Sequence, residues 1–200
     1  MADPSEPTVA EGSPKRSHWL RETLVVVVVA LAAAFLLRTF VVQTFYIPSG
    51  SMEPTLQIGD RILVDKLSYH LHGVDRGNIV VFKRPEAEDC GGPPVADLVK
   101  RIIGLPGETI SLRKGHVLID GKVLHESWLP SSVQGTTFPG PSGPTYNLAK
   151  PYVIPSNHYF VMGDNRADSC DSRYWGPIAR ALIVGKVDVR VWPITGVHFF

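Results

Sequence analysis

The feature that most constrains this chain is one apolar run near its N-terminus. Residues 24–37 contain no polar side chain, and residues 40–42 extend the run beyond Arg38. As a helix, residues 24–42 would be roughly 28 Å long, close to the roughly 30 Å of a bilayer's hydrocarbon core. Arg38 lies near the end of the run, where its long side chain can reach the interface. We therefore predict a single transmembrane helix over residues 22–43.

The charges before this run predict its orientation. Lys15, Arg16 and Arg21 precede it, so the N-terminus is expected to stay in the cytoplasm as a disordered tail over residues 1–21. Everything after the helix is then outside, on the far side of the cell membrane. A cleavable signal peptide is the alternative, because residues 32–34 offer an A-x-A site. That site lies inside the apolar run, which argues against cleavage.

The composition of the remaining chain favours strands and turns. Glycine (18) and proline (17) are both frequent, and apolar residues occur in short runs. The net charge of +1 gives no reason to expect nucleic acid as a partner. The two cysteines, Cys90 and Cys170, are too few for a disulfide framework, although one bridge is possible outside the cytoplasm.

Several short segments have the pattern of β-strands. The turn Asp120-Gly121 predicts a two-residue hairpin between two apolar segments. Valines at every second position from 187 to 191 predict a half-buried strand. The other predicted strands are 61–66, 78–82, 98–103 and 158–162.

The residues directly after the apolar run form a stiff frame around two hydroxyl groups. Pro48 and Pro54 fix their own φ angles, Gly50 permits unusual dihedrals, and Ser49 and Ser51 lie between the prolines. Such a frame can hold a serine in one exposed pose. On this stretch alone, a plain proline-bounded loop is an equally good interpretation.

A hydrolytic serine needs a base, and histidine is the first candidate. His158 could join Asp164 in a Ser-His-Asp scheme, but no G-x-S-x-G motif surrounds Ser51. His70 and His72 lie two positions apart and could ligate a metal, but loop histidines are the simpler interpretation.

Lysine is the other candidate base. The pKa of a free lysine is near 10.4, and burial can lower it by several units. Lys100 has Leu98 and Ile102 on its own face of a predicted strand. The alternative is a strand lysine with its amine in solvent.

Four motifs in order carry a family resemblance. They are Ile-Pro-Ser-Gly-Ser-Met-Glu-Pro-Thr-Leu (47–56), Arg-Gly-Asn-Ile-Val-Val-Phe (76–82), Val-Lys-Arg-Ile-Ile-Gly-Leu-Pro-Gly-Glu (99–108) and the charged, turn-rich segment 163–176, which ends on Tyr-Trp-Gly. With the preceding apolar run, this set resembles bacterial type I signal peptidases, also called leader peptidases. The resemblance covers residues 20 to 192.

The resemblance implies a Ser-Lys dyad. By match to the family's motifs, Ser51 is the nucleophile, Lys100 the general base, and Ser169 the serine that orients the lysine. The Ser49 hydroxyl and the Ser51 backbone N–H match the oxyanion hole. The residues that match the charged scaffold beneath the site are Asp164, Arg166, Asp171 and Arg173. The residues that match the walls of the substrate pocket are Phe45, Ile47, Val81 and Val99.

The resemblance also implies a fold and a substrate. We expect a mainly β protein: one transmembrane helix, then an antiparallel β catalytic domain (44–110 and 156–200) with a small inserted β subdomain (111–155). The implied substrates are signal peptides of secreted preproteins, cut after small residues at −1 and −3. No metal or organic cofactor is implied, and we expect a monomer bound to the phospholipid membrane.

Three points qualify this interpretation. Ala167-Asp168 stands where Asp-Asn is more usual in the family, and Asn78 where Asp is usual. A self-cleaving repressor-type Ser-Lys peptidase would share a related fold, but this chain has a membrane segment and no DNA-binding domain. A membrane-tethered β-rich binding module without catalysis is the non-enzyme alternative.

The roles implied for Ser169 and Lys100 bear on the two cysteines. Cys170 adjoins Ser169, and Cys90 lies in the loop that leads to the Lys100 strand. If Ser169 touches Lys100, the cysteines are close, and we predict a disulfide between them. Two unpaired thiols are the alternative.

Overall fold

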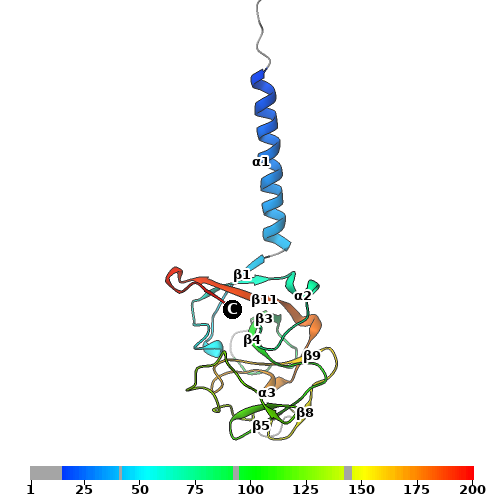
Figure 1. The fold of residues 1–200 in the computed structure, drawn as a ribbon, viewed down its shortest axis with the longest axis vertical. Coiled ribbons are helices and arrows are strands. Elements are labelled where there is room, and N and C mark those ends of the chain that lie inside the picture. Colours follow the sequence, from blue (N-terminus) through cyan, green and yellow to red (C-terminus); the bar gives the residue numbers. More distant parts are fainter. Residues whose placement is uncertain (1–14, 41, 92–94, 142–145) are drawn as a thin grey trace, which may run out of the picture. The chain divides into compact units, whose positions relative to one another are not determined.

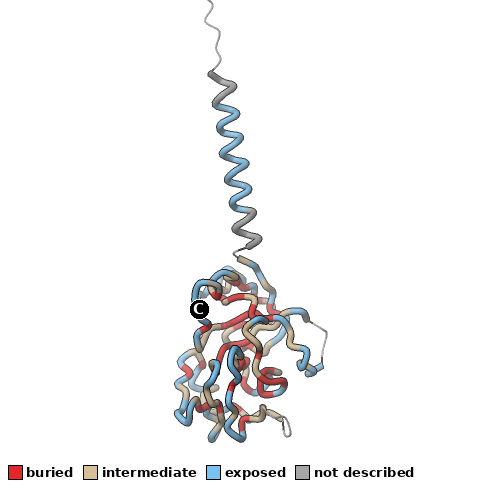
Figure 2. Tube along the Cα trace, turned by 90° about the vertical axis from the view of Figure 1, so that its right-hand side faces the viewer, coloured by how far each residue is buried: buried red, intermediate tan, exposed pale blue. Residues whose placement is uncertain are grey.

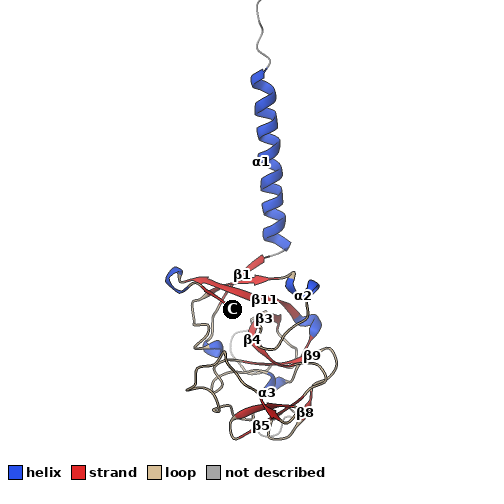
Figure 3. Cartoon of the chain, in the orientation of Figure 1, coloured by secondary structure: helices blue, strands red, loops and turns tan. Residues whose placement is uncertain are grey.

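The computed structural model describes residues 15–40, 42–91, 95–141 and 146–200, except for the side chains of residues 15–18, 35–40 and 70. It divides the chain into two compact units, Met1–Thr39 and Phe40–Phe200. Figure 3 shows that the first is helical and that strands dominate the second.

The first unit is formed by helix α1 (Lys15–Phe40). The helix begins earlier than predicted, because no glycine or proline interrupts the sequence after Pro14; residues 15–21 are therefore helical and not part of a disordered tail. Its described side chains, from Trp19 to Ala34, are exposed (Figure 2). Within the described residues, none of the helices combines the length and hydropathy needed to cross a membrane. Side chains 35–40 and residue 41 of the predicted span lie outside the described part.

The second unit contains an antiparallel sheet of eight strands in the order β1-β2-β11-β3-β4-β9-β10, with β12 paired to β11 (Figure 1). The prediction of a mainly antiparallel β fold is thereby confirmed. The strands are β1 (Val42–Tyr46), β2 (Arg61–Asp65), β3 (Ile79–Lys83), β4 (Asp97–Gly104), β9 (His158–Met162), β10 (Ile178–Ala179), β11 (Ile183–Trp192) and β12 (His198–Phe199).

Strand β1 corrects one predicted boundary. The transmembrane helix was expected to continue to residue 43, but α1 ends at Phe40 and Val42 already pairs with Asp65 of β2. Val42 and Gln43 therefore obtain their backbone hydrogen bonds from the sheet, which a β-branched residue such as Val42 suits well.

A smaller antiparallel sheet has four strands in the order β7-β6-β5-β8. They are β5 (Thr109–Arg113), β6 (His116–Ile119), β7 (Lys122–Val123) and β8 (Tyr152–Val153). The predicted hairpin joins β6 to β7, and Asp120 (φ 49°) and Gly121 (φ 76°) both have the positive φ of a type I′ turn. These strands fall within residues 109–153, close to the predicted insertion, although its standing as a separate subdomain stays a prediction.

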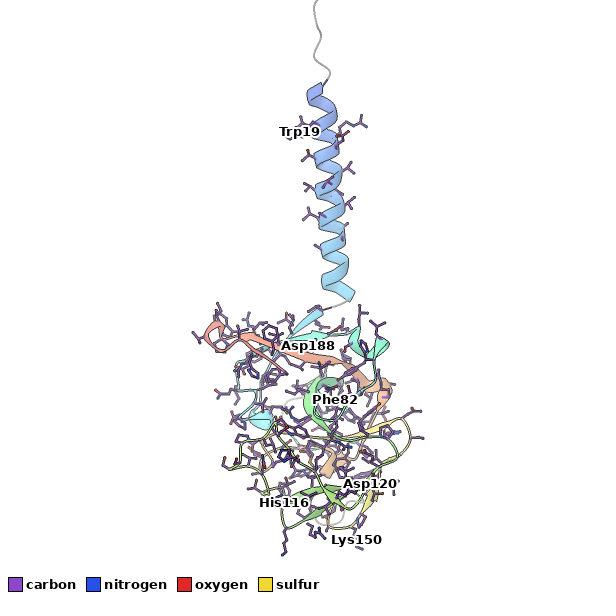
Figure 4. The ribbon with its side chains drawn as sticks, in the orientation of Figure 1. Trp19, Phe82, His116, Asp120, Lys150 and Asp188 are labelled. Carbon is purple, nitrogen blue, oxygen red and sulfur yellow. A yellow bond between two sulfur atoms is a disulfide. The ribbon has the colours of Figure 1, made fainter. Side chains whose placement is uncertain are left out.

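The two sheets share apolar packing. Ile103 and Phe160 of the large sheet pack in one buried cluster with Ile110 and Val117 of the small sheet. A second buried cluster includes Phe82 of β3, which is labelled in Figure 4. It also contains Ile102 of β4, Val161 of β9 and, from the segment after β9, Trp175. Short helices complete the unit: α2 (Ser68–Leu71), α3 (Ser172–Trp175) and the 3₁₀ turns η1 (Gly50–Met52), η2 (Arg180–Leu182) and η3 (Ile194–Gly196).

Candidate active site

The loop after β1 holds Ser51 in a defined position. The Ile47 N–H donates to the Asp60 carbonyl and the Gly59 N–H to the Ile47 carbonyl, both at 2.9 Å, so the two ends of the loop are closed by backbone bonds. The turn η1 follows Ser49, and Met52 at its end is buried in the apolar core. The side chain of Ser51 is thus presented on a short, anchored turn.

Strand β4 brings Lys100 to the same point. Lys100 Nζ lies 2.6 Å from Ser51 Oγ, although the residues are 49 positions apart. Lys100 is opposite Val80 of β3, and only 4% of its surface is exposed. The structure therefore brings together the serine and the lysine that the sequence singled out.

The environment of Lys100 changes its protonation. Burial lowers the pKa of the amine from its ordinary value of 10.5 to about 8, although the carboxylates of Asp171 and Glu88 act in the opposite direction. At neutral pH, the fraction of neutral amine is then roughly 300 times that of an ordinary lysine. A neutral amine next to a hydroxyl can accept its proton.

The segment 163–176 packs directly against the serine loop. The Asn165 N–H donates to the Ser51 carbonyl at 3.1 Å, and its side-chain amide donates to the Gly50 carbonyl at 3.2 Å. Gly163 lies so close that a Cβ there would be 2.2 Å from the Ser51 carbonyl oxygen and 2.3 Å from Ser169 Oγ. Neither Asn165 nor Gly163 was identified as a site residue from the sequence; both belong to the Gly-Asp-Asn-Arg motif, which was the available signal.

Ser169 and Ser49 lie near the pair without strong hydrogen bonds to it. Ser169 is buried, and its Oγ has no hydrogen-bond partner among the described residues, so the expected bond to Lys100 is not formed here. Ser49 Oγ lies 3.5 Å from Ser51 Oγ. Both hydroxyls retain unused hydrogen-bonding capacity.

The predicted charged scaffold is buried, but only one pair forms within the segment. Arg173 Nε and Nη2 each donate to the Asp171 carboxylate at 2.8 Å. Burial acts to raise the pKa of Asp171, but hydrogen bonds from Arg173 and from the Gly163 N–H outweigh it and lower the pKa. Asp171 is therefore a fixed negative charge under the site.

The other two scaffold residues pair with partners from elsewhere in the chain. Arg101, next to Lys100, donates two hydrogen bonds to Asp164 at 2.8 and 2.6 Å. Arg166 forms a double hydrogen bond with Glu126, in the connection between β7 and β8. Arg101 and Glu126 were missed because nothing in their local sequence indicates these long-range contacts.

A pocket of about 620 Å³ opens beside Ser51 and Lys100. Phe45, Ile47 and Val99 line it, as the resemblance implied. Val81 does not belong to the lining; it is fully buried and lies opposite Val99 in the sheet.

The predicted disulfide is confirmed. Cys90 and Cys170 are bonded, with their Cα atoms 6.2 Å apart. They form, with Glu88, the one group of potential metal ligands among the described residues, but the sulfurs are already bonded to each other. His70 cannot be assessed because its side chain lies outside the described part.

Comparison with known proteins identifies the family. The family model described as "Signal peptidase, peptidase S26" matches residues 20–192. The chain is 38% identical to "Signal peptidase I" of Leptolyngbya laminosa, covering 96% of this chain and 88% of that protein. It is 36% identical to "Signal peptidase IB" of Staphylococcus aureus over 88% of this chain and 91% of that one.

One solved structure gives a further match. A crystal structure of a signal peptidase I from Enterococcus faecalis has 29% identity and a TM-score of 0.42, covering 57% of this chain and 97% of that chain. The family model and the named relatives identify the class of protein as a peptidase. From the match of the family model, this chain belongs to the signal peptidase family, peptidase S26.

Proposed function

We propose that this chain is a membrane-anchored serine endopeptidase that removes signal peptides from secreted preproteins by a Ser51–Lys100 dyad. The observation that carries the proposal is the 2.6 Å separation of Ser51 Oγ and a buried Lys100 amine. Family membership supports the reaction class.

In the proposed mechanism, Lys100 transfers two protons in turn, one in each half of the reaction. Its neutral amine accepts the Ser51 hydroxyl proton as Oγ attacks the scissile carbonyl carbon. The resulting ammonium gives that proton to the leaving nitrogen as the C–N bond breaks, which leaves an acyl-enzyme. Water then attacks the ester, with Lys100 accepting the water proton and returning it to Ser51 Oγ.

The developing oxyanion needs donors that are already in place. We assign this role to the Ser51 backbone N–H and the Ser49 hydroxyl, which lies within the same loop. Ser169 is assigned the positioning of Lys100, because a buried hydroxyl without a partner is unusual and can bond the amine during the reaction.

Bulky walls explain the proposed preference for small residues. Phe45, Ile47 and Val99 surround the pocket next to the nucleophile. Side chains larger than a methyl group at −1 and −3 would clash with them, and the substrate would lie as an added strand between the Ile47 and Val99 segments.

The apolar run and the charges before it support membrane anchoring. We propose one span within α1, from residue 24 to residue 40, a cytoplasmic N-terminus and a monomeric catalytic domain on the outer face. This places the active site in the compartment into which preproteins are exported.

Cleavage of a preprotein with an Ala-x-Ala site by the full chain in detergent tests the proposal. The native chain should release the mature protein, and Ser51→Ala should release none. Ser131→Ala, at an exposed serine, is the matched control and should behave as the native chain. A native chain that binds the preprotein without cutting it would favour the binding-module alternative.

A further inference from the structure

Asp168 is a charged residue of the pocket lining for which the structure shows no ion-pair partner among the described residues. The charged residues that line the pocket are Arg84, Glu88, Asp97, Lys100 and Asp168. Arg84 forms an ion pair with Glu88, and Asp97 pairs with Lys83 at 2.8 Å.

Asp168 differs from the others because its carboxylate is exposed and has no ion-pair or hydrogen-bond partner among the described side chains. Residues 92–94, which the structure does not describe, are Gly-Pro-Pro and carry no charge. Asp168 is therefore a negative charge in the pocket lining that no ion pair among the described residues balances.

The position of Asp168 relative to the nucleophile is fixed by hydrogen bonds. Its backbone N–H donates to the carbonyl and to the side-chain oxygen of Asn165, both at 3.2 Å. Asn165 in turn donates to the carbonyls of Ser51 and Gly50. The next residue, Ser169, is buried, so the backbone on both sides of Asp168 is held.

The sheet topology indicates which part of a substrate meets Asp168. Strands β1 and β4 are separated by four antiparallel pairings, through β2, β11 and β3, and therefore run in the same direction. The two pocket walls thus lead together from Phe45 and Leu98 toward Ser51 and Lys100. A substrate with −3 near Phe45 and −1 at Ser51 leaves the site at the catalytic end, beside the segment that carries Asp168.

We infer that Asp168 forms a subsite for the first residues of the mature protein, +1 and +2, that favours a basic side chain and rejects an acidic one. This inference rests on the proposed function.

The test uses one preprotein in three versions, with Lys, Gln or Glu at +2 and, in a second set, at +1. For the native chain in low salt, we expect kcat/KM to be about tenfold higher with Lys than with Glu at the same position, at whichever of +1 and +2 shows the larger effect. Asp168→Asn should bring this ratio close to one, and Asp168→Lys should reverse it. Reversal by a charge swap would not arise from a merely structural role.

Glu86→Gln is the matched control, because Glu86 is an exposed acid outside the pocket lining. It should keep the native ratio. The ratio of the native chain should also fall in high salt, since an exposed charge pair is screened. This measurement needs no variant and stays decisive if a substitution disturbs folding.

The outcomes separate the two claims. If the native chain cuts none of the versions, the proposed function is wrong. If it cuts all of them in a Ser51-dependent manner with Lys and Glu rates equal at both positions, or if Asp168→Asn keeps the native ratio, the subsite is wrong and the peptidase proposal is unaffected.

Discussion

At the scale of single residues, the pKa of Lys100 is the property on which the proposed chemistry depends. Only the neutral amine can accept a proton, so activity should rise tenfold per pH unit below the pKa and level off above about 8. With the pKa of an unperturbed lysine, activity would continue to rise to above pH 10. A pH profile of kcat/KM measures the pKa that governs this rise. A pKa near 6.5 in that profile, removed by one histidine substitution, would contradict a lysine base.

Replacement of the lysine tests the same group directly. Lys100→Arg keeps a positive charge but cannot be deprotonated near neutral pH, so cleavage should fall by at least 1,000-fold, in line with the loss of a catalytic base. Lys122→Arg, at an exposed position of β7, should retain native turnover. Turnover by Lys100→Arg within tenfold of native, in a folded sample, would exclude Lys100 as the base.

Gly163 is expected to be as sensitive as a catalytic residue although it has no side chain. In Gly163→Ala the new methyl group would overlap the Ser51 carbonyl oxygen and Ser169 Oγ, so the nucleophile loop must move. A displacement near 1 Å costs about 100-fold in rate. Steady-state kinetics should show this loss in kcat, whereas Gly73→Ala, where the methyl group meets open space, should be neutral.

At the scale of elements, a buried ion pair joins the segment 163–176 to the connection between the small strands. Glu126→Gln would leave the Arg166 guanidinium buried without its counter-charge, which typically costs 3–5 kcal/mol, so about that loss in free energy of unfolding is expected. Asp188→Asn removes a half-exposed partner of Lys186 and should cost less than about 1 kcal/mol. Denaturant titration measures the free energy of unfolding of both variants. Equal losses in the two would contradict a stabilising role for the buried Glu126–Arg166 pair.

The disulfide joins two loops that both contribute to the pocket lining. It closes a separation of 80 residues, and loss of a native bridge typically costs about 2–4 kcal/mol of stability. Cys90→Ser with Cys170→Ser should therefore lower the thermal midpoint relative to the native chain. Addition of reductant should lower the native midpoint to the same value and leave the double variant unchanged, which distinguishes the lost bond from altered packing.

The sequence predicted elements well where local pattern decides them. The alternating valines gave β11, and Asp120-Gly121 gave the β6–β7 hairpin, because strand period and positive-φ turns are local properties. Strands β8 and β10 have only two residues each and follow from pairing with distant neighbours, which no local pattern reports.

The same limit applies to the candidate site. Ser51 and Lys100 were singled out from loop stiffness, an apolar strand and motif order, and the structure places them in contact. The partners of Asp164 and Arg166 could not be predicted, because Arg101 and Glu126 reach them across 63 and 40 positions. Val81 was assigned to the pocket wall, but it is fully buried and is not among the residues that line the pocket.

At the scale of the whole molecule, the proposal requires the active site and the N-terminus to lie on opposite sides of the membrane. The basic residues before the apolar run favour a cytoplasmic N-terminus, and one span then places the Phe40–Phe200 unit outside. Protease added to right-side-out vesicles should digest this unit and spare an N-terminal tag.

A charge variant makes this topology test sharper. Replacing Lys15, Arg16 and Arg21 with Glu removes the positive charges before the run, so a fraction of chains should insert in the opposite orientation. In those chains the tag becomes accessible and the catalytic unit protected. The Cys90–Cys170 bond should also be lost from that fraction, because the cytoplasm keeps thiols reduced. Full protection of the catalytic unit in the native chain would contradict the proposed orientation, whatever its activity in detergent.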